Sequence, residues 1–269
     1  PYWANNTRHV AAWNDYFMLE SYLKRAYPIA GLSMTAALLD PPYGALPDSI
    51  TVNNALRYNK VIAVMNGEPV FRRYYGMVAD SGGVMVGRGD LPGLVSCGPT
   101  GSGNWDWDFD GSYGDWYGAH ELGHNYGRHH VLCRGDEAGW DLGYPFPGGW
   151  ISGSQLAADP ATWYGFDFEG PTLLPPSYKD TMTYCDFEWP SNYTYRAIWA
   201  MMLMEGGGAQ VAAAAAPAEH LLVQASLNAS GVITPTSFLR LPGSIDAFGS
   251  VAGEYSVRLL NAAGTTLSE

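Results

Sequence analysis

Charged residues are scarce in this sequence, and basic residues are the scarcest. Only 15% of the residues are charged, and 14 Lys and Arg stand against 26 Asp and Glu, which gives a formal net charge of -12. Proteins that bind nucleic acids or anionic membrane surfaces present a basic patch to the phosphate groups. The composition therefore excludes both of these as expected partners.

Long apolar runs and a visible leader are also missing. The longest apolar stretches, AIWAMMLM at 197–204 and VAAAAA at 211–216, are far shorter than the roughly 18 to 20 residues that span a bilayer. The chain opens at Pro1 without the basic and apolar segments of a signal peptide. We expect no transmembrane segment, and we expect the mature form of a secreted, extracellular protein.

Cysteine is rare as well, with Cys97, Cys133 and Cys185 as the only three. They permit at most one intramolecular disulfide and leave an odd thiol. Cys133 and Cys185 each lie close in sequence to one of the two motifs described below, so a bridge between them would tie those motifs together. The alternative is three buried free thiols, because cysteine is among the residue types most often buried.

The sequence does contain enough apolar residues to fold. Hydrophobic residues make up 47% of its 269 residues, and the 33 Gly and 18 Tyr indicate a globular protein rich in loops and aromatic side chains. Apolar spacing and turn residues predict helices over 10–27, 51–65 and 193–205, a strand over 32–40, short strands within 76–96, and a long irregular region over 131–180.

The composition changes after residue 205. Residues 206–219 are rich in Gly and Ala and are typical of a linker. Residues 220–269 alternate apolar and polar side chains between turn signals, which predicts a small all-β, sandwich-like module. Residues 1–205 mix predicted helices and strands, so we expect them to form one α/β (α+β) domain.

The segment HELGHNYGRHH at 120–130 holds four of the six histidines of the chain. On a helix, His120 and His124 are one turn apart on the same face, so both imidazoles can reach one metal ion at about 2.0 to 2.1 Å. Glu121 lies between them and is placed to take a proton from water at that ion. This part of the segment predicts half of a catalytic metal site.

A third ligand must approach from another direction. Gly127 can adopt the positive φ that ends a helix without steric cost, and the resulting turn would bring His130 toward the ion. His129 would take its place if the turn were one residue shorter. The turn therefore leaves His129 and His130 as candidates, and the spacing of His130 fits the clan pattern described next.

The full pattern H-E-x-x-H-x-x-G-x-x-H resembles the signature of the metzincin clan of zinc metalloendopeptidases. The second hallmark of that clan is a methionine turn further along the chain, and DTMTYC at 180–185 fits it, with Met182 52 residues after His130. The stretches YPFPGG at 144–149 and WPSNYTYR at 189–196 are similar to segments of large bacterial secreted metzincins that carry β-sandwich modules behind the protease.

The resemblance implies a role for each matching residue. Glu121 would be the general base and would pass the proton to the leaving amine. Met182 would form an apolar floor beneath the ligands, and Tyr184 would stand where some clan members have a tyrosine that ligates zinc or stabilises the oxyanion. The Zn²⁺ ligands would be His120, His124 and His130.

The resemblance also implies a fold and a function. We expect residues 1–205 to form a metzincin-like domain with a twisted sheet, an active-site helix and a loop-rich lower half, acting as a monomeric endopeptidase on extracellular proteins or glycoproteins. One alternative is a zinc-containing module that binds glycans or glycoproteins without catalysis, although Glu121 would then have no use. Another is a latent enzyme whose zinc is blocked by the thiolate of Cys97.

Two weaker patterns lie near this site. Asp106, Asp108 and Asp110 match the D-x-D-x-D-G opening of a calcium loop, but Tyr117 stands where such a loop has a bidentate Glu. The alternative is a solvated acidic loop. Residues 82–87 fit either an exposed edge strand that pairs with an extended peptide or an ordinary core strand.

Overall fold

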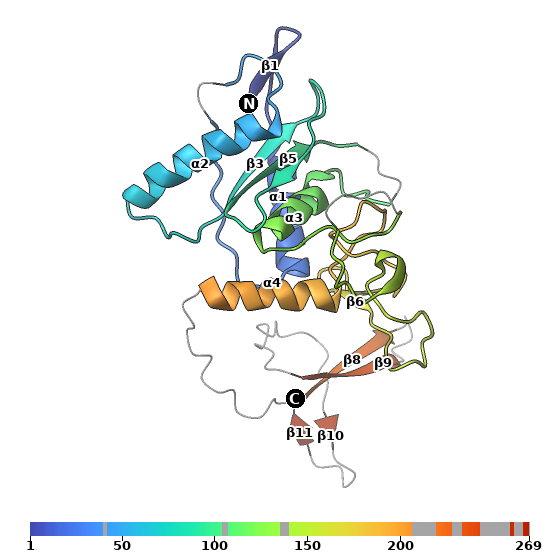
Figure 1. Cartoon of the computed structure of the whole chain (residues 1–269). Helices are drawn as coiled ribbons and strands as arrows, with labels where there is room; N and C mark the ends of the chain where they lie inside the picture. Colours follow the sequence, from blue (N-terminus) through green and yellow to red (C-terminus); the bar gives the residue numbers. More distant parts are fainter. Residues whose placement is uncertain are drawn as a thin grey trace. The chain divides into compact units, whose positions relative to one another are not determined.

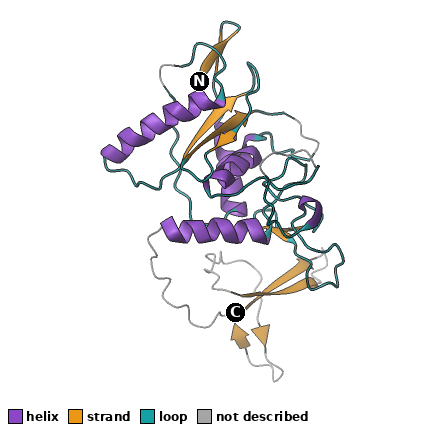
Figure 2. Cartoon of the chain, viewed as in Figure 1, coloured by secondary structure: helices purple, strands orange, loops and turns teal. Residues whose placement is uncertain are grey.

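The computed structural model describes residues 1–39, 42–103, 107–134 and 140–205, together with the backbone of four strands beyond residue 218. The chain divides into two compact units, Pro1–Ala209 and Gln210–Glu269. The described residues of the first unit form four helices, which are mixed with short strands (Figures 1 and 2). The helices are α1 (Trp13–Ala26), α2 (Ser49–Met65), α3 (Gly114–Asn125) and α4 (Asn192–Glu205), with a short 3-10 turn at Pro147–Gly149.

The strands of the first unit form three small sheets. Two of these are antiparallel pairs, one joining β1 to β2 and the other joining β6 to β7. In the third sheet β5 lies in the middle, parallel to β3 and antiparallel to β4. The strands are β1 (Tyr2–Ala4), β2 (Thr7–His9), β3 (Tyr74–Ala79), β4 (Arg88–Gly89), β5 (Val95–Thr100), β6 (Gly165–Asp167) and β7 (Thr172–Leu174).

Helices cover both faces of the sheet formed by β3, β5 and β4 (Figure 1). Alternate residues of a strand point to opposite faces, and β3 follows this rule. Tyr74 and Val78 pack with residues of α2, whereas Tyr75 and Met77 pack with the cluster formed by α1 and α3. Gly76 must be small, because a Cβ there would overlap the side chain of Val52 in α2.

The larger core lies between α1 and α3. On the α1 side, Leu19, Leu23 and Ala26 are buried, and they pack with Ala119 and Leu122 of α3. Burial of this many apolar side chains is the main stabilising contribution available to a domain of this size. The core therefore fixes α3, which carries the histidine motif, against the rest of the unit.

The helix predictions are confirmed, with boundaries within three residues of those expected. The predicted strand over 32–40 is wrong, because residues 32–39 form no regular secondary structure. Leu32 and Met34 pack against the α1 and α3 core, while Leu38 is exposed. No strand of the described sheets pairs with this segment, so its backbone follows the surface of the core.

The region between α3 and α4 consists mostly of loops, as predicted (Figure 2). Residues 82–87 form no strand either, and Val84 and Val86 are exposed there. The short strand β4 follows this segment, and Asp90, directly after it, is paired with Arg57. None of the described helices is both long and apolar enough for a membrane span.

The second unit is described only through its strands. β8 (Glu219–Leu227) pairs antiparallel with β9 (Ile233–Pro242), and β10 (Leu259–Leu260) pairs antiparallel with β11 (Thr266–Ser268). The expected linker at 206–219 lies outside the described residues except for the first residue of β8. A sandwich-like arrangement of this unit stays a prediction.

Candidate metal centre

Helix α3 places the first two histidines. The helix is almost entirely buried although it contains three glycines, which normally weaken a helix. Close neighbours explain all three, because a Cβ would overlap Thr100 from Gly114, press on Leu19 from Gly118 and overlap the sulfur of Met182 from Gly123. The helix ends at Asn125, and Gly127 has a φ of +77°, which reverses the chain toward His130.

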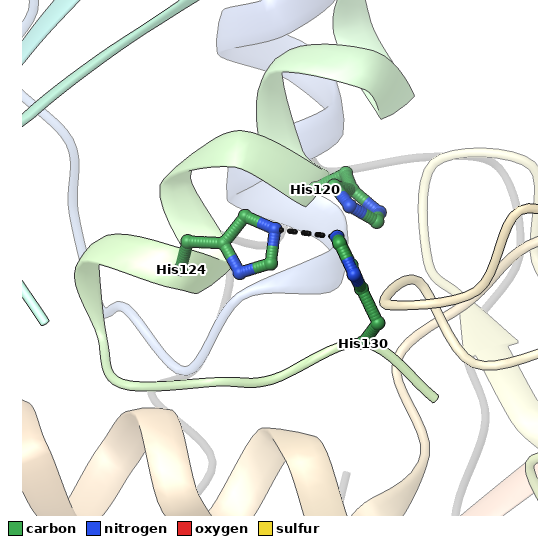
Figure 3. Close-up of side chains that lie close together, drawn as sticks. All are labelled: His120, His124 and His130. Carbon is green, nitrogen blue, oxygen red and sulfur yellow. Dashed lines mark hydrogen bonds between the residues drawn. The ribbon is translucent and has the colours of Figure 1, made fainter. Parts of the chain in front are cut away.

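Three imidazoles converge after this turn (Figure 3). His120 and His124 come from α3 and His130 from the segment beyond it, and one ring nitrogen of each lies within 4.8 Å of those of the other two. The Nε2 atoms of His124 and His130 are 3.0 Å apart. Two ligands at about 2.05 Å from a tetrahedral ion would be about 3.3 Å apart, so this separation is close to the one a shared ion requires.

Main-chain carbonyls fix the orientation of two of these rings. Nδ1 of His120 lies 2.8 Å from the carbonyl oxygen of Thr181, and Nδ1 of His124 lies 2.7 Å from that of Arg128. A carbonyl oxygen can only accept, so each Nδ1 must carry the proton and each Nε2 offers a lone pair to the centre. His120 Nε2 is buried and has no hydrogen-bond partner in the described part of the chain. A cation at the centre would satisfy this atom.

Burial keeps two of the three histidines in the neutral form, which can bind a metal ion. Desolvation lowers the pKa of His120 well below its ordinary value, and it lowers the pKa of His124 to about 4. Both rings are therefore neutral at physiological pH, which is the ligating state of histidine. His129, in contrast, is exposed and is not part of the group whose nitrogens converge.

Glu121 directly follows His120 on α3 and is also buried. Burial raises the pKa of its carboxyl to about 8, against an opposing hydrogen bond from the backbone of Gly89. The segment that enters β4 passes directly over this carboxylate, since a Cβ on Gly87 would overlap Glu121 Oε1. Glycine at 87 therefore leaves room for the carboxylate, a feature that we did not anticipate from the sequence.

Met182 lies directly beneath α3 and is fully buried. Its turn is held by hydrogen bonds: Asp180 Oδ1 accepts from the N–H of Met182 at 2.9 Å, and the carbonyl of Met182 accepts from the N–H of Val131 at 2.8 Å. The second bond ties the turn to the residue that follows His130. The methionine turn and the third histidine are therefore parts of one structure.

A disulfide joins the same two segments. Cys133 and Cys185 are bonded, and the bridge closes a loop of 52 residues. The pairing considered from the sequence is therefore present. Cys97, the remaining thiol, is buried in the core on the α2 face of the sheet, and desolvation raises its pKa to about 12. A thiol in that state is protonated, which speaks against the latent enzyme with a Cys97 thiolate.

Tyr184 contacts two of the three histidines. Its hydroxyl lies 2.7 Å from Nε2 of His130, and its ring stacks on His120 with centroids 5.5 Å apart. Unlike the ligand rings of α3, Tyr184 is 54% exposed. Its hydroxyl can therefore reach both the centre and a molecule bound from solvent.

Asn125 is a buried residue of the site region that sequence reasoning missed. Its side-chain amide donates to the carbonyls of Asp90 and Val95, both at 3.0 Å, and its Oδ1 accepts from Ser96. These bonds attach the end of α3 to the strand pair β4 and β5. Its position directly after HELGH was the only available signal, because the bonds themselves join segments about 30 residues apart.

The acidic loop before α3 differs from the sequence expectation. Asp106 lies outside the described residues. Asp108 and Asp110 are described, and their carboxylates converge with that of Asp115, which is in the first turn of α3. Tyr117, the residue at the twelfth position of the calcium-loop pattern, instead accepts a hydrogen bond from the N–H of Gly87 at 3.0 Å.

Comparisons with protein-family models, with curated protein sequences and with solved structures return no match to this chain.

Proposed function

We propose that this chain is a zinc-dependent endopeptidase that resembles the metzincin clan. One observation carries the proposal: three imidazoles converge, and the buried carboxyl group of Glu121 directly follows the first of them on α3. A purely structural zinc site is normally closed by four protein ligands. Three histidines with a neighbouring glutamate are typical of a catalytic site that keeps one position open.

The donor set fits zinc. Imidazole nitrogen suits borderline ions such as Zn²⁺, whereas Ca²⁺ and Mg²⁺ prefer oxygen ligands. His120, His124 and His130 would hold the ion. When bound, zinc would polarise the scissile carbonyl and lower the pKa of a water molecule from 15.7 to about 7.

Glu121 would act as the proton carrier of the reaction. Its carboxylate would take the proton of the attacking water and deliver it to the leaving amine. The carboxylate is held by burial and by the backbone of the 87–89 segment, so it does not have to be ordered when substrate binds. A nearby cation would oppose the upward shift of its pKa and favour the ionised form that acts as a base.

Tyr184 would stabilise the negative charge that develops on the carbonyl oxygen. Its hydroxyl is a hydrogen-bond donor at the edge of the centre, and donors aimed at the developing oxyanion are among the largest contributors to such catalysis. The exposed position of the ring would allow the hydroxyl to move from His130 to the substrate.

The segment 84–87 supplies a surface for an extended peptide. Val84 and Val86 are exposed, and a hollow of about 470 Å³ lined in part by Met85 and Tyr117 lies beside them. Main-chain pairing of a peptide with an extended segment is a common recognition mode. This arrangement supports a polypeptide substrate, which we take to be an extracellular protein or glycoprotein.

A secreted protein is consistent with the remaining features, and a monomer stays the prediction made from the sequence. Structural disulfides such as the one between Cys133 and Cys185 persist mainly in oxidising compartments. The excess of acidic residues gives no basis for binding nucleic acid. A zinc-containing glycan-binding module without activity is the alternative that an assay must address.

The decisive experiment compares the full chain with Glu121→Gln at equal zinc content. Both proteins are incubated with a denatured protein and with a mucin-like glycoprotein, and the new peptide termini are identified by mass spectrometry. We expect cleavage by the unaltered chain and a loss of about 10²-fold or more in Glu121→Gln, because the proton carrier is removed while the ligands stay. If neither protein cleaves either substrate with zinc bound, the protease proposal fails and the binding module becomes the better explanation.

A further inference from the structure

A second group of convergent ligands lies about the N-terminal turn of α3, away from the histidines. Asp108 and Asp110 extend from the preceding loop, and Asp115 belongs to the first turn of the helix. One carboxylate oxygen of each lies within 4.8 Å of those of the other two. Three anionic groups at this separation repel one another unless a positive charge lies between them.

Asp115 is the informative member of this group. Its side chain is only 2% exposed, and its Oδ1 atom has no hydrogen-bond partner in the part of the chain that the structure describes. An ionised carboxylate that is buried and unpaired is very costly, so proteins pair such groups or bind a cation to them. Arg25 is near enough to influence Asp115, but it forms its ion pairs with Asp167 and Glu169.

The other two carboxylates are held in place by neutral donors. The indole N–H of Trp116 donates to Asp108 Oδ2 at 2.9 Å, and the N–H of Ser112 donates to Asp110 Oδ1 at 3.0 Å. These bonds orient the groups without neutralising them. In agreement with uncompensated charge, burial and the neighbouring aspartates raise the pKa of Asp115 well above its ordinary value and raise that of Asp108 to about 6.

The donor set indicates the kind of ion. Carboxylate oxygens are the ligands of hard cations, and Ca²⁺ accepts six to eight oxygen ligands in a flexible geometry, whereas Mg²⁺ demands a nearly ideal octahedron and usually keeps several waters. We propose that Asp108, Asp110 and Asp115 bind a calcium ion that fastens the loop at 107–112 to the start of α3. The site uses a buried residue of the helix that the linear calcium-loop pattern does not contain.

An ordinary structural role for Asp115 makes the opposite prediction. An acidic residue in the first turn of a helix stabilises it through the helix dipole, with or without calcium. Under that explanation, Asp115→Asn would lower the melting temperature in every buffer. Under the calcium proposal, removal of one repelling charge leaves the calcium-free protein at least as stable, and the loss is seen only when calcium is present.

Terbium luminescence tests binding directly. Tb³⁺ replaces Ca²⁺ at oxygen sites and emits when a nearby tryptophan absorbs light, and Trp116 is hydrogen-bonded to one of the ligands. The full chain is freed of calcium, loaded with one equivalent of zinc, and titrated with Tb³⁺ and then with Ca²⁺. We expect a saturable signal that Ca²⁺ displaces, and an affinity about tenfold weaker or worse in Asp115→Asn and in Asp110→Asn, because ligand charge sets calcium affinity.

Melting temperature supplies the second readout, and Asp159→Asn supplies the matched control. Asp159 lies in an exposed loop and bonds to the backbone N–H of Ala161. At constant zinc, Ca²⁺ at about 100 times its dissociation constant should raise the melting temperature of the unaltered chain and of Asp159→Asn by about 5 °C or more. Asp115→Asn should not respond. The proposal is overturned if the unaltered chain binds neither ion at millimolar concentration, or if Asp115→Asn binds and responds as the unaltered chain does.

Discussion

The disulfide between Cys133 and Cys185 allows a quantitative prediction. We consider the double variant Cys133→Ser/Cys185→Ser, which opens the bridge without deleting side chains from the core, since both cysteines are only partly buried. The bridge closes a loop of 52 residues, and the chain-entropy relation gives about 4 kcal/mol of stabilisation for a loop of that length at 25 °C. That is a large part of the stability of a typical domain.

The expected consequence is a lower melting temperature. For a unit of this size, 1 kcal/mol corresponds to about 2 to 4 °C, so the double variant should melt about 8 to 16 °C lower. Zinc affinity should fall as well, because the bridge joins the segment of His130 to the turn of Met182, and bound zinc would then have to order both. Calorimetry and circular dichroism measure the first effect, and competition with a zinc indicator measures the second.

Reductant provides the control for this experiment. It should lower the melting temperature of the unaltered chain to that of the double variant and leave the double variant unchanged, because Cys97 is already a free thiol. A double variant that melts within about 2 °C of the unaltered chain would refute the reasoning, since the entropy of a 52-residue loop would then not be a significant part of the stability. A double variant whose melting temperature still falls in reductant would also refute the reasoning.

Three further predictions concern the centre itself. His130→Ala should weaken zinc binding by about 100-fold or more, whereas the matched variant His129→Ala should bind zinc normally, and equal zinc contents in the two would contradict the ligand assignment. Gly123→Ala should lower the melting temperature by about 2 to 8 °C, because the steric overlap with Met182 destabilises the fold by more than the higher helix propensity of alanine stabilises it. An unchanged melting curve would show that the methionine can move. Tyr184→Phe should keep its zinc but lose about 10²-fold to 10³-fold in kcat with little change in KM, and full activity would remove Tyr184 from the mechanism.

Sequence-based prediction was most successful for structural features that depend on residues within one short segment. The spacing of His120 and His124 and the glycine at 127 are properties of a short segment, and the structure brings His130 to the pair through the left-handed turn at that glycine. A methionine and a cysteine about 52 residues later could be located only because a known pattern led us to look for them. Spacing alone gives no sign that Val131 bonds to Met182.

Features that depend on distant partners were missed or wrongly predicted. Residues 32–39 have the composition of a strand, but a strand exists only where another strand offers its hydrogen bonds, and that cannot be read from the segment itself. Asp115 illustrates the same limit for a site. In the sequence it is one acidic residue near the start of a helix, and only the folded chain shows that its buried carboxylate converges with those of Asp108 and Asp110.

The acceptors for His120 and His124 are backbone carbonyls, and this determines which changes the centre can tolerate. The carbonyl oxygens of Thr181 and Arg128 keep their positions when those side chains are exchanged, so the backbone conformation determines the orientation of each imidazole. Point substitutions at positions 128 and 181 should therefore leave the orientation of the two imidazoles unchanged. An insertion or deletion of one residue between Asn125 and His130 would disorient two of the imidazoles together, so we expect natural variants of this protein to differ there in the residue at 128 but never in length.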